Sequence, residues 1–285
     1  MREGAAIKKE AAAGEIPGRM EERTFNGFRN IVYERSGISL GPNKEALVSS
    51  RIAKRMRALG IARHEDYLAY VENDEGDELV HLIDAISTNV TSFYREPDHF
   101  DFLRKRFLEW MHAGQRRFRL WCAASSTGEE PYTIAITLHD AMAGQPLDVK
   151  ILATDISTRV LGHCVQGIYP KEKTANVPPV LRDTYFEPVL VEGERMHSVS
   201  QDLRQMIAFR RLNLAKPPFP MRGPLDVVFC RNVMIYFDNA TRTRLLREIY
   251  RLLKPGGFLI VGHAESLTGM VSDFKSVQPS VYIKQ

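Results

Sequence analysis

The chain has 285 residues, of which 44% are hydrophobic and 26% are charged, and its formal net charge is +4. This composition is typical of a globular protein with one large domain or two modest domains. The mild positive charge does not indicate a nucleic-acid-binding protein in the absence of a localised basic patch. No apolar run reaches the roughly 18 to 20 residues that a membrane span requires.

The first residues and the cysteines indicate the cellular compartment. Residues 1–20 are polar and lack the apolar segment of a signal peptide, so we interpret them as a disordered tail. Cys122, Cys164 and Cys230 are an odd number of cysteines without metal-ligand spacing. This pattern favours reduced structural thiols in a cytoplasmic protein, and we expect no bound metal.

Residues 21–86 carry apolar side chains at three- and four-residue spacing, which predicts a small helical domain. A helix near residues 44–58 places its apolar and basic side chains on different faces. The basic face consists of Arg51, Lys54, Arg55 and Arg57. It is either a solvated surface or a docking site for an acidic partner helix. No acidic residue at helical spacing within residues 51–59 neutralises it, which keeps the docking hypothesis open.

The segment 87–96 interleaves polar and aromatic residues just before a helix rich in phenylalanine. A mobile linker typically carries glycine or proline and fewer aromatic residues. The segment therefore predicts the wall of a site at the start of a second domain, residues 87–285.

An apolar strand over residues 118–122 is followed by a loop of small residues and then a helix. Ser126 with Glu129, and Thr127 with Glu130, have the spacing of a capping box. Open α/β sheets build cofactor cradles from such strand–loop–helix units, although an ordinary turn has the same pattern.

The chemistry of this loop favours one class of ligand. It lacks the glycine-rich fingerprints that bind pyrophosphate or triphosphate, and Glu129 and Glu130 would repel phosphate. S-adenosylmethionine, with hydroxyl groups, an amino group and a sulfonium, suits carboxylates at this position. A second strand, residues 149–153, leads to Asp155, at an offset typical of an acid that binds ribose hydroxyls. A helix-capping role for Asp155 is the alternative, and the two roles are compatible.

The remaining elements complete an α/β fold. Residues 168–211 combine prolines with short alternating stretches, including 207–210, and predict an inserted antiparallel sheet. A strand (225–230), a helix (239–253), a strand (258–261) and an edge strand (280–283) follow. Strands and helices thus alternate into a mostly parallel sheet that is covered on both faces.

Three segments together resemble the chemotaxis receptor methyltransferases, the CheR family. They are residues 88–96 (TNVTSFYRE), 124–132 (ASSTGEEPY) and 230–237 (CRNVMIYF), and the resemblance extends from about Phe25 to Tyr282. It implies a helical N-terminal domain joined to a class I, Rossmann-like methyltransferase domain with a small inserted β-subdomain. The implied activity is S-adenosylmethionine-dependent methylation of glutamate side chains on chemoreceptor cytoplasmic helices. The products are γ-methyl esters and S-adenosylhomocysteine, and we expect a monomer.

The resemblance also assigns roles to residues. It places Arg95 and Tyr236 near the transferred methyl group. The implied cofactor-binding residues are Asn89, Thr91, Arg95, Glu130, Asp155, Asn213, Leu214, Cys230, Arg231 and Asn232. The resemblance also implies that the basic face of the helical domain docks the receptor, because receptor methylation helices are rich in Glu and Gln. In some family members the inserted sheet binds a short tethering peptide at the receptor C-terminus.

Three other functions remain as alternatives. Residues 232–236 lie where nucleic-acid N-methyltransferases carry Asn/Asp-Pro-Pro-Tyr, but both prolines are absent here. A non-catalytic S-adenosylmethionine-binding adaptor would be indicated by loss of Arg95 or Tyr236, and both are present. A nicotinamide-dependent oxidoreductase is disfavoured by the missing glycine fingerprint.

Overall fold

The computed structural model describes residues 20–74, 77–267 and 273–285, and within them the chain divides into two compact units. The first holds the helices up to Ile31 together with Leu40–Ile86, and the second holds Val32–Ser39 together with Ser87–Gln285. Apart from Met20, the expected tail lies outside the described residues. Within the described parts of the chain, no helix is both long enough and apolar enough to cross a membrane.

The first unit is helical, as predicted. Its elements are α1 (Glu22–Ser36, whose last turns belong to the second unit), η1 (Pro42–Lys44), α2 (Glu45–Leu59), α3 (His64–Glu72) and α4 (Asp77–Ile86). The face of α2 that points inward carries Val48, Ile52 and Met56, all fully buried, at the four-residue spacing that aligns side chains on a helix. A single apolar stripe per helix therefore builds the core of this unit.

Glu78 of α4 is a buried charge in this helical core. Only 2% of its surface is exposed, and its carboxylate accepts hydrogen bonds from Arg55 Nε at 2.9 Å and from the Tyr67 hydroxyl at 2.7 Å. Glu78 of α4 thus neutralises Arg55 of the predicted basic face. The spacing of residues within α2 cannot reveal this partner, because it lies on another helix.

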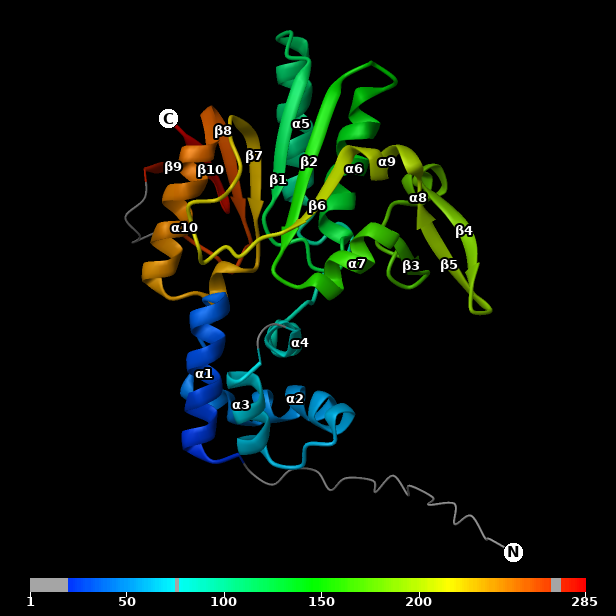
Figure 1. Cartoon of the computed structure of the whole chain (residues 1–285). Coiled ribbons are helices and arrows are strands. Elements are labelled where there is room, and N and C mark those ends of the chain that lie inside the picture. The colour runs from blue at the N-terminus through cyan, green and yellow to red at the C-terminus, as the bar shows by residue number, and fades with distance from the viewer. Residues whose placement is uncertain (1–19, 75–76, 268–272) are drawn as a thin grey trace, which may run out of the picture. The chain divides into compact units, whose positions relative to one another are not determined.

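The second unit alternates strands and helices along the chain (Figure 1). Its elements are α5 (Asp98–His112), β1 (Arg117–Cys122), α6 (Glu129–Met142), β2 (Asp148–Asp155), α7 (Thr158–Gln166), β3 (Ile168–Pro170), α8 (Pro179–Tyr185), β4 (Phe186–Val191), β5 (Glu194–Val199), α9 (Gln201–Met206), β6 (Ile207–Arg211), β7 (Leu225–Cys230), η2 (Met234–Tyr236), α10 (Asn239–Leu252), β8 (Leu253–Val261), β9 (Phe274–Gln278) and β10 (Val281–Lys284).

The main sheet has seven strands in the order β6-β2-β1-β7-β8-β10-β9. The first five run parallel, and β10 and β9 continue the sheet with antiparallel pairing. From β1 the chain builds outward through β2 and β6, and then returns to the other side of β1 with β7. The carboxyl ends of β1 and β7 therefore form the switch point where open α/β sheets bind ligands.

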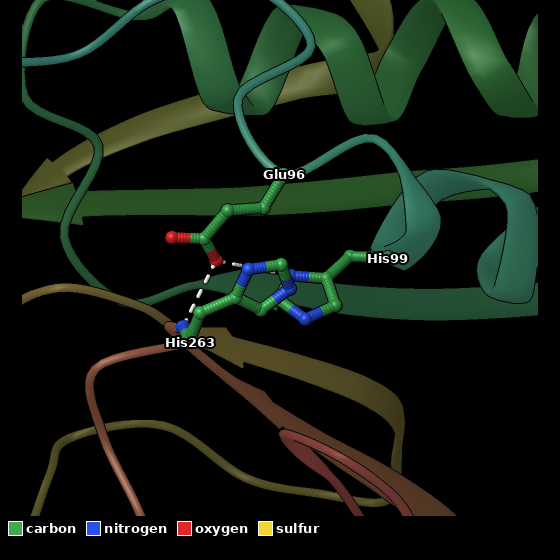
Figure 2. A group of neighbouring side chains, drawn as sticks. All are labelled: Glu96, His99 and His263. Carbon is green, nitrogen blue, oxygen red and sulfur yellow. Dashed lines mark hydrogen bonds and ion pairs between the residues drawn. The ribbon is translucent and has the colours of Figure 1, made fainter.

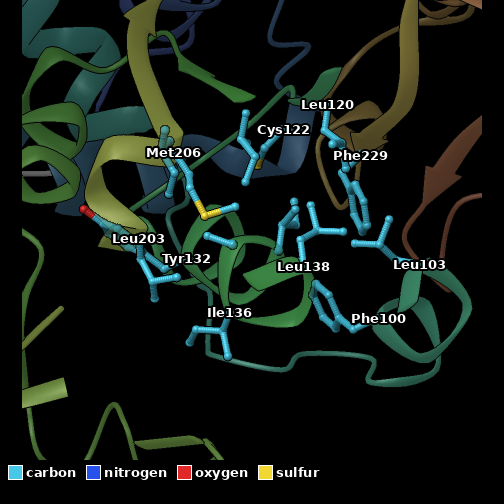
Figure 3. Close-up of a cluster of buried hydrophobic side chains, with 14 of the residues drawn as sticks. Phe100, Leu103, Leu120, Cys122, Tyr132, Ile136, Leu138, Leu203, Met206 and Phe229 are labelled. Atoms are coloured by element: carbon cyan, nitrogen blue, oxygen red, sulfur yellow. The ribbon is translucent and has the colours of Figure 1, made fainter. Parts of the chain in front are cut away.

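Both faces of the main sheet are covered, because alternate residues of each strand point to opposite sides. Phe118, Leu120 and Cys122 of β1 join one core, packed on α5, α6 and α9 (Figure 3). Trp121 joins the other core, which α10 covers. Figure 1 shows α10 on the sheet face opposite α5 and α6. The predicted α/β class, with a mostly parallel sheet, is confirmed.

The inserted sheet is smaller than the sequence predicted. It contains three antiparallel strands in the order β3-β5-β4. The stretch 207–210, expected in this sheet, instead forms β6, which pairs parallel with β2 at one end of the main sheet. An alternating pattern identifies a strand but not its partner, and α9 brings the chain back to the main sheet just before Ile207.

The buried Glu78 provides a stability test for the helical unit. Substitution Glu78→Ala leaves the Tyr67 hydroxyl without its acceptor and removes the partner of Arg55. We expect the free energy of unfolding to fall by about 1–3 kcal/mol, the cost of unsatisfied buried polar groups. Urea denaturation measures this change. The control Glu72→Ala, an exposed glutamate at the end of α3, is expected to change stability far less.

Candidate active site

The loop after β1 lies against the ends of its two neighbouring strands. The Ala123 N–H donates to the carbonyl of Phe229 in β7, and the Ser125 N–H donates to that of Thr154 in β2. The Ser126 N–H donates to the Asp155 carboxylate at 2.9 Å. The structure thus brings Asp155 to the loop that the sequence predicted as a cofactor cradle. A second Asp155 oxygen accepts from the Ser157 N–H, so the acid also shapes the turn into α7.

Arg231 joins the three sequence segments that carry the family resemblance. Its side chain is fully buried. Its guanidinium donates to Glu130 Oε2 at 2.6 Å, to Glu96 Oε2 at 3.0 Å and to the Arg95 carbonyl at 2.6 Å. The ring of Phe100 lies 5.5 Å from the guanidinium carbon. We call this arrangement the Arg231 bridge.

The Arg231 bridge joins a positively charged guanidinium to the carboxylates of Glu96 and Glu130. Burial alone would raise the pKa of Glu96, but the charge and hydrogen bond of Arg231, with the backbone N–H of His263, hold this pKa below its ordinary value. For Arg231, burial acts to lower the pKa, and the two carboxylates more than offset it. A buried guanidinium between two carboxylates therefore stays protonated, and its planar fork fits both partners.

The three cysteines are free and buried. Burial raises the pKa of Cys122, Cys164 and Cys230, and the charge of Glu130 adds to the shift at Cys122. The Cys122 thiol donates to Glu130 Oε1 at 3.2 Å. All three side chains therefore act as neutral packing groups at neutral pH, in agreement with the predicted structural thiols.

The predicted capping boxes do not form. Gly128, with φ +101°, occupies the N-cap position of α6, and the Thr127 hydroxyl bonds to the Glu129 carboxylate rather than to the backbone. A β-carbon at Gly128 would lie only 2.5 Å from the Tyr169 hydroxyl. The close approach of Tyr169 therefore selects glycine here, and the capping-box spacing in the sequence was misleading.

Asn89, Thr91 and Arg95 lie on the segment that leads to α5. The side-chain nitrogen of Asn89 is buried and has no hydrogen-bond partner among the described residues. The Thr91 carbonyl accepts a long hydrogen bond from Lys173 at 3.4 Å. Arg95 donates from Nη1 to the Val90 carbonyl at 2.9 Å, and 37% of its side chain is exposed. Arg95 is thus a cation that is accessible to solvent.

Asn213 and Leu214 follow β6. The Asn213 side chain donates to the Arg35 carbonyl at 2.7 Å and accepts from the Ala215 N–H at 2.9 Å. Leu214 is buried in the core that α10 covers. The Leu212 N–H donates to the Asp155 carbonyl, so the chain at this point passes the end of β2. Any contact of Asn213 with a cofactor would therefore come from its backbone or from a rearranged side chain.

The loop after β7 is held by Glu265, which sequence reasoning missed. Its carboxylate accepts backbone hydrogen bonds from Asn232 at 2.7 Å, Met234 at 2.7 Å and Gly262 at 2.8 Å. Burial raises the pKa of Glu265, although these N–H groups act in the opposite direction. No local pattern marks this residue, because its role depends on the approach of two distant loops.

Tyr236 ends the short helix η2 and is partly buried, with its N–H bonded to the Val233 carbonyl. Met234 is buried, whereas 46% of Ile235 is exposed. A 3₁₀ turn has three residues per turn, so three consecutive residues point in three directions, and they cannot all face the core.

The backbone of the site is strained at several non-glycine residues. Tyr94, Glu96, Ser126 and Asn232 have φ values of 54°, 56°, 47° and 56°. They lie in the three segments that meet at the Arg231 bridge. Such conformations cost of order 1–3 kcal/mol each and persist where the surrounding structure imposes them.

The predicted basic face on α2 is only partly available. Arg51 donates to the Ile86 carbonyl, and Arg55 pairs with Glu78. Both are partly buried, whereas Lys54 and Arg57 are exposed. Within the described residues, the exposed charge of this face therefore comes from Lys54 and Arg57.

The cradle suits S-adenosylmethionine. Buried polar atoms without a hydrogen-bond partner in the described chain include Asn89 Nδ2, Ser126 Oγ and Arg231 Nε, and each belongs to one of the three converging segments. Buried polar groups normally find partners, so this concentration indicates a polar ligand. Hydroxyl, amino and carboxylate groups of the cofactor match such donors and acceptors, and the carboxylates of Glu130 and Asp155 suit its cationic and hydroxyl groups.

Substitution Arg231→Lys tests the bridge. A lysine offers one point charge and cannot span both carboxylates and the Arg95 carbonyl as the planar guanidinium does. We expect the free energy of unfolding to fall by about 1–3 kcal/mol and the affinity for S-adenosylhomocysteine to weaken. Urea denaturation and isothermal titration calorimetry measure these effects. In the control Arg251→Lys, which changes a half-exposed arginine paired with Glu248, both quantities should be nearly unchanged. Equal behaviour of the two variants would contradict the role of the bridge.

Comparisons with known proteins agree with this geometry. The family described as "CheR methyltransferase, SAM binding domain" matches residues 89–283, and "CheR methyltransferase, all-alpha domain" matches residues 23–87. The chain is 38% identical to "Chemotaxis protein methyltransferase 2" of Pseudomonas aeruginosa over 90% of its own length and 91% of the relative. It is also 38% identical to "Chemotaxis protein methyltransferase" of Klebsiella aerogenes, covering 92% and 90% of the two chains. Its identity to the Escherichia coli protein of the same name is 37%, covering 92% and 91%.

The matches run through both units, and the three segments that carry the family resemblance converge on one cradle. The chain therefore belongs to the CheR family of S-adenosylmethionine-binding chemotaxis methyltransferases.

Proposed function

We propose that the protein transfers the methyl group of S-adenosylmethionine to glutamate side chains on the cytoplasmic helices of chemoreceptors. The products are γ-glutamyl methyl esters and S-adenosylhomocysteine, and the reaction adapts chemotaxis signalling in the cytoplasm. Family membership supports the cofactor and the reaction class. The observation that carries the choice of a carboxylate substrate is the exposed cation Arg95 beside the cradle.

Arg95 differs from Arg231 in what it can still bind. Within the described residues, its guanidinium donates a hydrogen bond only to the Val90 carbonyl, and Glu96 lies 3.9 Å away. A guanidinium has five N–H donors. Arg95 therefore has donors left for an incoming carboxylate, whereas Arg231 is fully buried within its own carboxylate pairs.

The chemistry requires orientation more than proton transfer. A glutamate is already ionised at neutral pH, so no general base is needed. The cofactor supplies an electrophilic methyl group on a positively charged sulfur. As the new carbon–oxygen bond forms, the carbon–sulfur bond breaks, and the carboxylate and sulfonium charges cancel in a neutral ester and a thioether. Arg95 holds one carboxylate oxygen and thereby aims the other at the methyl carbon, while Tyr236 lines the path.

The exposed part of the basic face, Lys54 and Arg57, is proposed to dock the receptor. Methylation helices rich in Glu present acidic stripes, and exposed lysine and arginine complement them. Rim charges of this kind affect association and its salt dependence more than the chemistry of the site.

The inserted sheet is proposed as the position of a receptor tether peptide. In the strand order β3-β5-β4, the strand β4 lies at one edge, and Leu190 on this strand is 71% exposed. An extended peptide can add to such an edge through backbone hydrogen bonds and place alternate side chains beside an apolar residue.

Incubation with methyl-labelled S-adenosylmethionine and a receptor cytoplasmic fragment tests the proposed reaction. We expect label on the receptor fragment that mild base releases as methanol, as a methyl ester requires. A base-stable label, transfer to nucleic acid instead, or cofactor binding without any transfer would contradict the proposal in favour of the alternative functions.

Within this assay, Arg95→Ala tests the substrate contact. We expect single-turnover methyl transfer to fall tenfold or more, because a charge-assisted hydrogen bond contributes about 1.5–3 kcal/mol. Affinity for S-adenosylhomocysteine should fall much less. The control Arg104→Ala removes an exposed arginine of α5 that pairs with Asp140 and should leave transfer intact. Unchanged transfer in Arg95→Ala would exclude the proposed role of this residue.

A charge reversal tests the docking face. The double variant Lys54→Glu/Arg57→Glu should raise the KM for the receptor fragment without changing affinity for S-adenosylhomocysteine, and added salt should reduce the difference. Arg51 and Arg55 are left intact because they hold internal contacts. The control Arg23→Glu/Lys44→Glu changes the net charge equally at other exposed residues of the helical unit. If both variants behave alike, the face has no specific role in docking.

A further inference from the structure

Four side chains form a cluster beside the Arg231 bridge, which we call the imidazole–carboxylate cluster. It consists of Glu96, Asp98, His99 and His263. Figure 2 shows three of them, with Glu96 just before α5, His99 in its first turn and His263 on the loop after β8. One ligand atom each from Glu96, His99 and His263 can be chosen so that all lie within 4.8 Å of one another.

His99 is a buried imidazole without a hydrogen-bond partner among the described residues. Its side chain is fully buried, and both ring nitrogens are without a hydrogen-bond partner among the described residues. Nδ1 lies 3.5 Å from Glu96 Oε2, and Nε2 lies 3.9 Å from Asp98 Oδ2. An unsatisfied buried nitrogen carries a desolvation cost. A single ion can bind one nitrogen of the ring, and it would remove the cost at that nitrogen.

The ring of His263 completes the arrangement. Its Nε2 lies 3.2 Å from the same Asp98 oxygen, and its ring centre is 4.9 Å from that of His99. The His263 N–H donates to Glu96 Oε2 at 3.1 Å, which fixes the start of this loop beside the cluster. Half of the side chain is exposed, which gives an ion a route from solvent.

The charges favour a cation. Glu96, Asp98 and the adjacent Glu130 contribute three negative charges, and Arg231 and Arg95 contribute two positive charges, so the surroundings are negative by one charge. Both nitrogens of the buried His99 ring lack a hydrogen-bond partner among the described residues, so either nitrogen is available to a cation.

We propose that the imidazole–carboxylate cluster binds one divalent ion of the zinc type. Two imidazoles with one or two carboxylates form a ligand set that suits Zn²⁺, whereas Mg²⁺ and Ca²⁺ prefer oxygen ligands. The sequence analysis expected no bound metal because the cysteines lack metal-ligand spacing. The ligands proposed here include no cysteine, so that argument does not apply to them. His263 lies far along the chain from the other three residues, and only the fold brings them together.

Binding requires a modest contraction of the cluster. Tetrahedral zinc with bonds of about 2.0–2.1 Å holds its ligand atoms about 3.4 Å apart. The distances from Asp98 Oδ2 to the two rings already bracket this value at 3.2 and 3.9 Å. His263 is the half-exposed member, so a rotation of its ring can close the remaining distance without disturbing the buried core.

A bound ion would act on the structure of the site rather than on the methyl transfer. It would link the start of α5 to the loop after β8, through residues that adjoin the bridge partner Glu96. This inference does not depend on the proposed receptor substrate, because ion binding is measured without any methyl acceptor.

The experiment uses the full chain, without an affinity tag and after treatment with EDTA. Titration with Zn²⁺ in a calorimeter should show one ion per chain, and Co²⁺ should give the visible absorption of a tetrahedral site. His263→Ala should weaken Zn²⁺ binding tenfold or more, as expected for loss of a ligand. The matched control His112→Ala removes an exposed histidine from the last turn of α5 and should leave the affinity unchanged.

Two results would overturn the proposal. One is the absence of saturable Zn²⁺ binding to the wild-type chain. The other is binding that persists with equal affinity in both His263→Ala and Asp98→Asn, which would place the ion elsewhere. Both substitutions lie at half-exposed side chains, and circular dichroism verifies that the variants remain folded.

Discussion

The second unit depends on one buried cation. Removing a guanidinium and two carboxylates from water costs several kcal/mol per ion, and only close, well-oriented pairing offsets this cost. The Arg231 bridge provides such pairing and satisfies the Arg95 carbonyl as well. Arg231 follows β7, and its partners lie before α5 and at the start of α6, so the bridge joins three segments that are far apart in the chain.

The topology explains why these segments meet at this edge. The loops after β1 and β7 leave adjacent parallel strands toward opposite faces of the sheet, which is the switch point where open α/β sheets bind ligands. Two other parts of the chain reach these loops: the segment before α5 supplies Glu96, and the loop after β8 supplies Glu265. The site is therefore assembled from strand ends that the sheet fixes and from loops that buried carboxylates fix.

Sequence predicts the parts that local patterns determine. The apolar runs of β1 and β7 and the stripe of α2 follow from periodicity, and Asp155 at the end of β2 follows from its offset along the chain. The resemblance to a family supplied Arg231 and Glu130. The predictions that were wrong concern features that depend on tertiary contacts. Gly128 displaces the capping boxes because Tyr169 lies against it, and residues 207–211 join the main sheet because α9 returns them there. The strand β9 was missed because its residues are largely exposed and show no apolar alternation, and Glu265 was missed because its partners lie on a distant loop.

The left-handed backbone at Tyr94, Glu96, Ser126 and Asn232 has a consequence for how stability and binding are related. The folded chain already carries this conformational cost before any ligand arrives, so the cofactor meets a prearranged cradle and loses little affinity to ordering it. The same conformational cost lowers the free energy of unfolding of the protein. A change that relaxed these residues would give a protein that is harder to unfold and a cradle that holds its cofactor less firmly.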